Sequence, residues 1–311
     1  MFIGAVDIGG TKIAVGIVDE DGRLLAQRQT PTAAVAGFDG AMDRVTELLR
    51  QCGEEANVSV QGLGIGCTGP VDPITGRIGV VDFLPGWEDA SPVQVLGDRF
   101  GVSAAMENDA DAASLGEARW GSGKGVDSLI CVTVGTGIGG GIVLQGRLFR
   151  GVDGAHPEIG HHVIEPEGPP CFCGARGCWE ILAAGPAMAA WAEIHAPKDY
   201  AHRHDLSARH LCALARQGDA FAQTAVQREA RYLGLGIANL VTLFTPERIV
   251  LGGSVLQSAD LFLPTIHETV RHNCGLVPFE KTTIAMASLG PDTPLIGAAQ
   301  VWHHRFKPQG A

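Results

Sequence analysis

Three cysteines lie within eight residues of this chain, and a pair of histidines stands just upstream of them. The segment reads GHHVIEPEGPPCFCGARGCWE, and its candidate ligands are His161, His162, Cys171, Cys173 and Cys178. The chain has no C-x-x-C pair, so a dithiol redox site is not favoured. Three thiolates with one imidazole, from either histidine, match a closed structural zinc site. The alternative is a set of unliganded, buried cysteines.

A glycine turn near the start of the chain combines a carboxylate, a hydroxyl and an amine. The stretch DIGGTK contains Asp7, Gly9, Gly10, Thr11 and Lys12. The amides of such a turn can point at phosphate oxygens, while Thr11 donates a hydrogen bond and Lys12 supplies positive charge. Asp7 can hold a magnesium ion through water, because magnesium prefers oxygen ligands and keeps its waters. The alternative is an ordinary hairpin turn.

Two later glycine clusters have similar character. The first, GTGIGGG at residues 135–141, contains the pattern G-x-G-x-x-G. A dinucleotide fingerprint requires a following helix, whereas a strand is predicted here, so we expect a second phosphate-facing turn with Thr136 and Gly137 at its tip. A simple glycine hairpin is the alternative. The second cluster, VLGGS, carries Gly252 and Gly253, which suit either close approach to a nucleotide or packing between elements.

The stretch MENDADA places an amide and a carboxylate where a predicted strand ends and a helix begins. Asp109 at such a position can accept a proton from a substrate hydroxyl while Asn108 hydrogen-bonds another hydroxyl. Phosphoryl transfer needs this arrangement, because its catalysis is mainly positioning and charge stabilisation. Both residues are also common helix N-caps, and the local sequence does not distinguish the two roles.

The elements that must position these residues are strands and helices in alternation. Apolar patterns predict strands over residues 2–8 and 12–22, joined by a glycine hairpin, and a helix over 38–52. Residues 205–245 are predicted to be mostly helical. A glycine-rich break near residue 120 predicts two α/β domains. We expect them to span 1–120 and 121–292, with a closing helix at 293–311 that packs back on the first domain.

Composition narrows the classes of function. The 311 residues include 23 Lys and Arg against 34 Asp and Glu, a net charge of −11, and no block of basic residues. This balance disfavours nucleic acid as a partner, because binding to phosphate backbones needs clustered cations. No apolar run approaches the roughly 20 residues that span a bilayer, so no membrane association is expected. The start of the chain does not resemble a signal peptide, so we expect a cytoplasmic protein with reduced thiols.

Taken together, these motifs resemble those of the ROK family (repressors, open reading frames, kinases). DIGGTK resembles its first phosphate motif, GTGIGGG its second and END its catalytic segment. HPEIGH, followed nine residues later by CFCGARGCWE, resembles its zinc signature. The resemblance covers nearly the whole chain in the right order. It implies an actin-like ATPase (ribonuclease-H-like) fold, with two α/β domains flanking a cleft and a zinc-binding loop at residues 156–180.

The resemblance also implies residue roles. Asp109 would be the general base acting on the 6-hydroxyl of a hexose, and Asn108, Glu158, His161 and Glu180 would bind other sugar hydroxyls. His161 would be the zinc ligand of the histidine pair, with one ring nitrogen on zinc and the other toward the sugar. ATP would lie against the phosphate turns, with Mg²⁺.

The implied function is an ATP-dependent hexose kinase, most closely a glucokinase, and the implied assembly is a homodimer. N-acetylglucosamine or N-acetylmannosamine is the next candidate substrate, followed by fructose or mannose. Many glucokinase-like relatives have an Asn before a PGW segment, whereas this chain has Phe83 and Leu84 there. A sugar-sensing regulator is the alternative outside enzymes. We expect a kinase instead, because the base and phosphate motifs are intact and the DIGGTK motif begins at Asp7, leaving no room for a DNA-binding segment before it.

Overall fold

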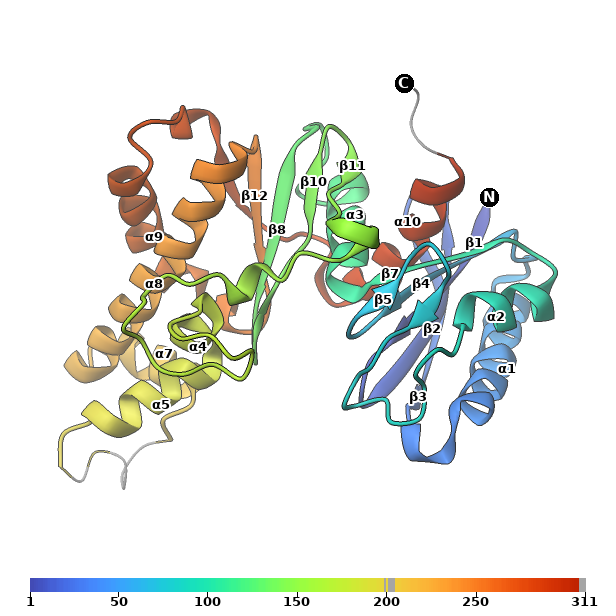
Figure 1. Ribbon diagram of the computed structural model, residues 1–311, viewed down its shortest axis with the longest axis horizontal. Coiled ribbons are helices and arrows are strands. Elements are labelled where there is room, and N and C mark those ends of the chain that lie inside the picture. The colour runs from blue at the N-terminus through green and yellow to red at the C-terminus, as the bar shows by residue number, and fades with distance from the viewer. Residues whose placement is uncertain (199, 201–204, 308–311) are drawn as a thin grey trace. The chain divides into compact units, whose positions relative to one another are not determined.

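The computed structural model describes residues 1–198, 200 and 205–307, and it divides into two compact units (Figure 1). The first unit comprises residues 1–129, residues 141–157 and the chain from 287 onward. The second comprises residues 130–140 and 158–286. Among the described residues, no helix is both long and apolar enough to cross a membrane.

A five-stranded sheet forms the centre of the first unit. Its order is β3-β2-β1-β4-β7, with antiparallel pairing among β1, β2 and β3 and parallel pairing of β4 with both β1 and β7. The strands are β1 (Phe2–Ile8), β2 (Lys12–Asp19), β3 (Leu24–Pro31), β4 (Gly62–Cys67) and β7 (Ala104–Asn108). The predicted hairpin is present, because Ile8 pairs with Ile13 across the double-glycine turn.

Both faces of this sheet are covered, as the alternation of buried side chains requires. On one face, Val6 and Ile8 pack in a cluster with residues of α1 (Phe38–Ala56). On the other, Ile3 and Ala5 pack with residues of α10 (Thr293–Phe306). The sheet is therefore a middle layer, and its inner strands β1 and β4 are buried along most of their length.

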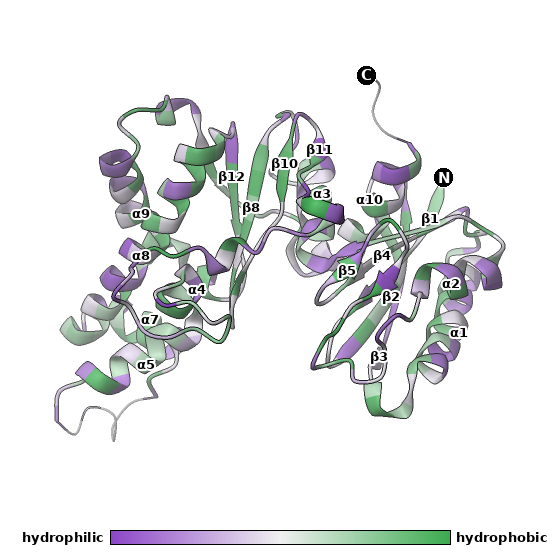
Figure 2. Ribbon diagram, viewed as in Figure 1, coloured by the Kyte–Doolittle hydropathy of each residue, from purple (hydrophilic) through white to green (hydrophobic). Residues whose placement is uncertain are grey.

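Helix α1 has the amphipathic pattern that the sequence predicts. Its buried residues include Met42, Val45 and Leu49, at helical spacing, and Figure 2 shows hydrophilic and hydrophobic positions mixed along its length. The helix ends at Asn57, whose left-handed φ of 53° closes the last turn. The expected end at residue 52 was thus one turn short.

Two glycines of β4 and one of α3 (Asp109–Trp120) let helix α10 pack closely. A Cβ atom at Gly64 would lie 1.8 Å from the carbonyl oxygen of Ala298, and one at Gly62 would lie 2.3 Å from the Trp302 ring. On α3, a Cβ at Gly116 would lie 2.9 Å from the Cα of Gly297. Helix α10 therefore rests directly on the backbones of β4 and α3.

The remaining elements of the first unit are short. They include α3 (Asp109–Trp120), α2 (Pro92–Phe100), β5 (Val71–Asp72), β6 (Arg77–Ile78), β10 (Ile142–Leu144) and β11 (Arg147–Leu148). The sequence pattern did not predict α2 or the β5–β6 hairpin. α2 begins in standard fashion, with Ser91 accepting a hydrogen bond from the Gln94 amide and Pro92 in its first turn.

The compact units are divided differently from the expected domains. Helix α10 packs on the first unit, as expected of segment 293–311, of which residues 308–311 lie outside the described part. Residues 121–129 and 141–157, however, also belong to the first unit. The physical reason is that Arg150 and His156 form ion pairs with acidic residues of β7 and α3.

In the second unit β8, β12 and β13 lie side by side in that order, with β9 antiparallel to β8. Figure 2 shows β8 as hydrophobic along most of its length. The strands are β8 (Leu129–Val134), β9 (Ile138–Gly139), β12 (Arg248–Gly252) and β13 (Thr283–Met286). The helices are α4 (Trp179–Ala183), α5 (Gly185–His195), α7 (Ala208–Arg216), α8 (Ala220–Phe244) and α9 (Ala259–Asn273).

Helix α8 is the long buried helix predicted within residues 205–245, and it contacts α4, α5, α7 and α9. One acidic residue of α8, Glu229, is buried, with no exposed side-chain area. The Arg228 guanidinium lies 3.4 Å from its Oε2 atom. Burial raises the pKa of Glu229 well above its usual value, although Arg228 acts in the opposite direction.

The glycine contacts of β4 generate a first prediction. Gly64→Ala should lower the free energy of unfolding by about 3 kcal/mol, because its Cβ would overlap a backbone oxygen that cannot move away. Gly40→Ala in α1 is the matched control, because its Cβ meets only the tip of Arg44 at 3.7 Å. The control should raise stability by about 0.5–1 kcal/mol in urea unfolding. Equal effects of the two substitutions would contradict this account of the packing.

Glu229 generates a second prediction, on stability and pH. A carboxyl group whose folded pKa is raised favours the folded state below its unfolded pKa, and that contribution is lost as pH rises through the folded pKa. The melting temperature of Glu229→Gln should therefore rise relative to that of the parent protein as pH increases from 5 to 8. Each kcal/mol of stability that the parent loses over this range corresponds to a difference of about 2–4 °C. The exposed Glu268→Gln should show no such trend. A difference in melting temperature between Glu229→Gln and the parent that does not change with pH would contradict a raised pKa of Glu229.

Candidate functional site

Two of the predicted motifs meet at one edge of the first-unit sheet. Strands β1, β4 and β7 run parallel, so their carboxyl ends lie together. Asp7 pairs with Gly66, and Asn108 pairs with Cys67. A Cβ atom on Gly66 would lie 3.7 Å from both the Asp7 Oδ1 and the Asp109 Cα. The small residue between them thus leaves the two carboxylates as neighbours.

Both carboxylates are perturbed by their surroundings. The pKa of Asp7 is raised to about 7, chiefly by burial and secondly by the nearby Asp109 charge, against the opposing effect of Lys12. Burial also raises the pKa of Asp109, against the opposing effects of the Ala110 amide and of His156. A raised pKa brings a carboxylate closer to the working pH of a general base. Strongly perturbed groups at a strand edge are typical of functional sites.

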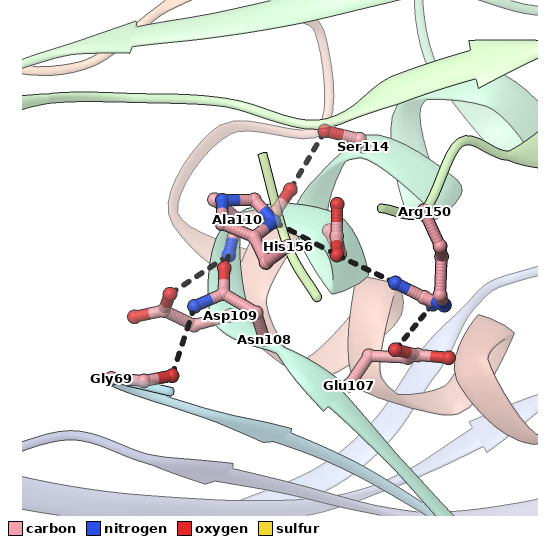
Figure 3. A network of polar contacts seen from close by, with 9 residues as sticks. Gly69, Glu107, Asn108, Asp109, Ala110, Ser114, Arg150 and His156 are labelled. Atoms are coloured by element: carbon pink, nitrogen blue, oxygen red, sulfur yellow. Dashed lines mark hydrogen bonds and ion pairs between the residues drawn. The ribbon is translucent and has the colours of Figure 1, made fainter. Parts of the chain in front are cut away.

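Asn108 and Asp109 form the start of α3 (Figure 3). The Asn108 Oδ1 accepts a hydrogen bond from the Ala110 amide at 2.9 Å, and its Nδ2 donates to the Gly69 carbonyl at 3.2 Å. The Asp109 Oδ1 also accepts from the Ala110 amide, at 2.8 Å. Asn108 is therefore an N-cap in this structure, whatever else it binds, whereas the second oxygen of Asp109 can still take a proton.

The DIGG turn is a tight hairpin tip with exposed side chains. The Gly9 amide donates to the Lys12 carbonyl at 3.0 Å, and Thr11 and Lys12 are exposed. A Cβ on Gly10 would lie 2.7 Å from that of Phe83, so Phe83 packs directly against this turn. The Phe83 side chain is 61% exposed. An aromatic ring thus borders the predicted phosphate turn.

The second glycine turn, in the other unit, is tied to a glutamate. The Gly135 amide donates to the Gly137 carbonyl at 2.9 Å, and Thr136 at the tip is exposed. The Ile138 amide donates to the Glu180 Oε2 at 2.8 Å. A Cβ on Gly137 would lie 2.4 Å from the same oxygen, so only glycine admits Glu180 there. The turn is built around this carboxylate.

The cysteine cluster forms with one particular histidine. The Cys171 Sγ lies 3.6 Å from the His161 Nδ1, and the Cys173 and Cys178 sulfurs are 3.5 Å apart. The ligand atoms of these four residues all lie within 4.8 Å of one another. His162 points elsewhere, with its Nδ1 2.6 Å from the Ile159 carbonyl oxygen.

The other ring nitrogen of His161 faces Glu180, with the Nε2 3.9 Å from the Oε1. Glu158 lies one turn before His161 and is exposed, and its carbonyl accepts the His161 amide at 3.0 Å. His161 and Glu180 are thus neighbours, and both predicted sugar-binding residues lie beside the second glycine turn.

A hollow of about 370 Å³ lies in the second unit, beside this turn. Its lining includes Gly135 and Thr136, the start of α5, one face of α7 and the segment after β12. Gly252 and Gly253 end β12 at this hollow, just before its lining residue Ser254. Gly253 has a φ of 98°, and a Cβ there would lie 2.3 Å from the Val134 carbonyl oxygen. This glycine therefore allows the segment after β12 to pack against β8.

A second, larger hollow of about 700 Å³ lies between α5, α8 and α9 and contains none of the motif residues. The sequence did not reveal the contributions of α5 and α7 to the smaller hollow. Nor did it reveal Arg150 and His156, which contact the acids near Asp109. The sequence signal that could have indicated the smaller hollow is the Gly-Pro pair at the start of α5. Glycine there allows α5 to approach the second glycine turn closely, and the Gly185 amide donates to the Gly135 carbonyl at 2.8 Å.

Comparison with known proteins supplies the context for these sites. The model of the ROK family matches residues 3–305. A glucokinase of Thermotoga maritima is 34% identical, over 97% of this chain and 97% of that protein. The crystal structure of a ROK hexokinase from Thermus thermophilus is 35% identical, covers 99% of this chain and all of its own, and gives a TM-score of 0.84.

A ROK glucokinase of Streptomyces griseus, solved in complex with glucose and AMPPNP, is 34% identical, with a TM-score of 0.78 over 98% of this chain and all of that chain. The family match and these structures confirm the expected actin-like fold. Because the match extends along almost the whole sequence, the chain belongs to the ROK family.

Proposed function

We propose that this protein is an ATP-dependent hexose kinase that transfers the γ-phosphoryl group to the 6-hydroxyl, with glucose as its preferred substrate. The observation that carries the proposal is Asp109, a half-buried carboxylate with a raised pKa, beside Asp7 at the carboxyl edge of three parallel strands. The similarity to proteins named glucokinase supports a kinase and favours glucose. N-acetylhexosamines, fructose and mannose are the alternatives.

In the proposed mechanism, Asp109 accepts the proton of the 6-hydroxyl as its oxygen attacks the γ-phosphorus. The hydrogen bond from the Ala110 amide to Oδ1 fixes the carboxylate at the start of α3. Because that bond holds one oxygen, the other is the one that takes the proton. Such base catalysis contributes about 10²- to 10⁴-fold to rate.

The nucleotide would be bound through glycine turns and the smaller hollow. The turn at Gly9 and Gly10 would present amides to phosphate, with Lys12 supplying charge. Thr136 and Gly137 would do the same from the second unit, where the 370 Å³ hollow beside Gly252 and Gly253 has the size of a small-molecule site. When bound, Mg²⁺ would neutralise phosphate charge, and Asp7 would orient its waters.

Sugar hydroxyls would be bound by Asn108, Glu158, His161 and Glu180. His161 and Glu180 are already held in mutual contact, at 3.9 Å. The exposed ring of Phe83, in place of an amide side chain, offers apolar contact and no hydrogen bond at its position. This substitution keeps sugars other than glucose among the candidates.

The cysteine cluster fits a structural zinc ion. Tetrahedral zinc with bonds to sulfur of about 2.3 Å places neighbouring sulfurs about 3.8 Å apart. The separations of 3.5 and 3.6 Å between cluster atoms are close to this value. Three thiolates and the Nδ1 of His161 would complete the coordination, leaving no position for a reactive water. Zinc would therefore hold His161 in place and take no part in the chemistry.

The proposed base generates a direct test. Asp109→Asn keeps the oxygen that accepts the Ala110 amide but cannot take a proton, so kcat should fall by about 10²- to 10⁴-fold with little change in the KM for ATP. Asp39→Asn, at an exposed position of α1, is the control. Coupled detection of ADP, across glucose and the alternative sugars, measures both. Turnover of no sugar by the parent protein would refute the proposed function, and full activity of Asp109→Asn would reduce Asp109 to a helix cap.

The proposed zinc site generates a fourth prediction. The parent protein should contain one zinc ion per chain by elemental analysis, and Cys173→Ser should lose it, with a lower melting temperature and a higher KM for the sugar. Cys274→Ser is the matched control, because Cys274 is buried but lies outside the cluster, with its sulfur 3.5 Å from the Ala238 carbonyl oxygen. The control can lose stability but should keep its zinc. Zinc-free, fully active parent protein would exclude the site.

A further inference from the structure

A buried cluster of charged side chains lies behind Asp109, and none of the motifs drew attention to it (Figure 3). It joins Glu107 of β7 and Asp111 of α3 to Arg150 and His156 of the segment that follows β11. The Arg150 guanidinium pairs with Glu107 and, at 3.0 Å, with the Asp111 Oδ2. The His156 Nδ1 lies 2.9 Å from that same oxygen. The Asp111 side chain has no exposed area, and His156 is 12% exposed.

The local sequence explains why these groups converge. Glu107 is the first residue of the END segment and Asp111 follows Asp109 by two residues, so the end of β7 and the first turn of α3 place them on either side of Asp109 in the sequence. A Cβ atom on Gly141 would lie 2.8 Å from the Asp111 Oδ1, so glycine lets the following segment run close to this acid. Arg150 and His156 then reach Asp111 from that segment.

The simplest role of His156 is to neutralise a buried acid. Arg150 already pairs with both carboxylates of the cluster, however, so Asp111 has a cationic partner without His156. His156 also lies near Asp109, because its partner Asp111 follows Asp109 by two residues in the first turn of α3, where Figure 3 shows both Asp109 and the imidazole. In agreement with this position, the imidazole lowers the pKa of Asp109 while burial raises it. His156 thus faces two carboxylates, of which only Asp109 has a proposed role in catalysis.

We propose that His156 is a positioning residue for Asp109: Asp111 holds the imidazole so that its charged form faces the base and keeps it ionised. The role rests on the proposed function of Asp109. Without the imidazole, the buried base would bind its proton more tightly and would be unavailable over part of the acidic range. His156 would thereby extend activity toward lower pH.

Other charged groups also face this pair. Around Asp109 they are Asp7 of β1, with Lys12 beyond it, and the buried Cys67 thiol of β4. Asp111 of α3 also acts on Asp109 and raises its pKa. Around the far side of the cluster, His304 and Arg305 of α10 act on Arg150, Asp111 and Glu107. These groups remain in place when His156 is replaced, so a change in the behaviour of Asp109 can be assigned to the imidazole.

The test is the pH profile of kcat/KM for the parent protein and for His156→Gln, which keeps an amide to bond Asp111 but carries no charge. The acid limb should move up by about one pH unit, because loss of a nearby opposite charge shifts a carboxyl pKa by about that amount or more. Well below the limb, kcat/KM should then be about tenfold lower, while the alkaline plateau should be unchanged. His156→Lys, which restores a positive charge at this position, should move the limb back toward that of the parent protein.

Two controls separate this role from a structural one. His303→Gln removes a half-buried ring that contacts Trp120 and Trp302 in the same unit, so it should change stability without moving the acid limb. A pH-independent loss of activity in His156→Gln, with no shift of the limb, would overturn the proposal and leave His156 as a neutralising partner of Asp111.

A measurement that needs no turnover keeps the inference separate from the proposed function. The pKa of Asp109 can be followed by carbon-13 NMR of protein with labelled aspartate, and Asp109→Asn identifies its resonance. His156→Gln should raise that pKa by about one unit. An unchanged value would overturn the positioning role, even if the kinase reaction is confirmed. A raised value in a protein that phosphorylates no sugar would instead refute the proposed function alone.

Discussion

Burial of carboxylates at the carboxyl edge of a parallel sheet is the constraint on which the rest of the site depends. Burial raises the pKa of Asp7 and Glu107 to about 7 and also raises that of Asp109. A buried negative charge is costly unless a cation or hydrogen-bond donor meets it. Lys12 is the cation that acts on Asp7, and Arg150 is the cation that pairs with Glu107. The buried acids at this edge are thus accompanied by two of the cations of the first unit.

The position of the proposed base depends in turn on how closely two helices meet. Asp109 is the first residue of α3, so any shift of that helix moves the carboxylate. A Cβ on Gly297 of α10 would lie 2.4 Å from the Ala112 carbonyl oxygen, and a Cβ on Gly116, one turn further along α3, would lie 2.9 Å from the Gly297 Cα. Close-packed interiors transmit such contacts with little slack. Helix α10, near the end of the chain, therefore restrains the helix that begins at Asp109.

Sequence patterns were sufficient wherever a role depends on local chemistry. The double-glycine hairpin, the strand before Asn108, the amphipathic helix α1 and the spacing of the cysteines are all short-range features, and the structure contains each of them. They could be predicted because turn geometry and helical periodicity act over a few residues.

The features that the sequence missed are those made by distant residues. Arg150 and His156 lie about 40 residues from Asp111 in the sequence, and no charge pattern connects them to it. Their segment belongs to the first unit, although the sequence placed it in the second domain. The smaller hollow likewise combines residues of α5, α7 and the end of β12, which tertiary packing alone brings together. The choice of histidine shows the limit of local spacing, because His161 and His162 are equivalent by spacing and only the family resemblance favoured His161, which lies with the cysteines in the structure.

In the second unit, a single carboxylate connects the metal cluster to the phosphate-facing turn. Glu180 accepts the Ile138 amide beside Gly137 and faces the Nε2 of His161, whose Nδ1 meets the cysteines. Its neighbour Trp179 is fully buried, and a Cβ on Gly236 of α8 would overlap its ring, so α4 is held firmly. An ion bound to the cysteines would thus restrain His161, and through it the Glu180 carboxylate and the glycine turn. The cluster acts at a distance from the phosphate turn because Glu180 belongs to both.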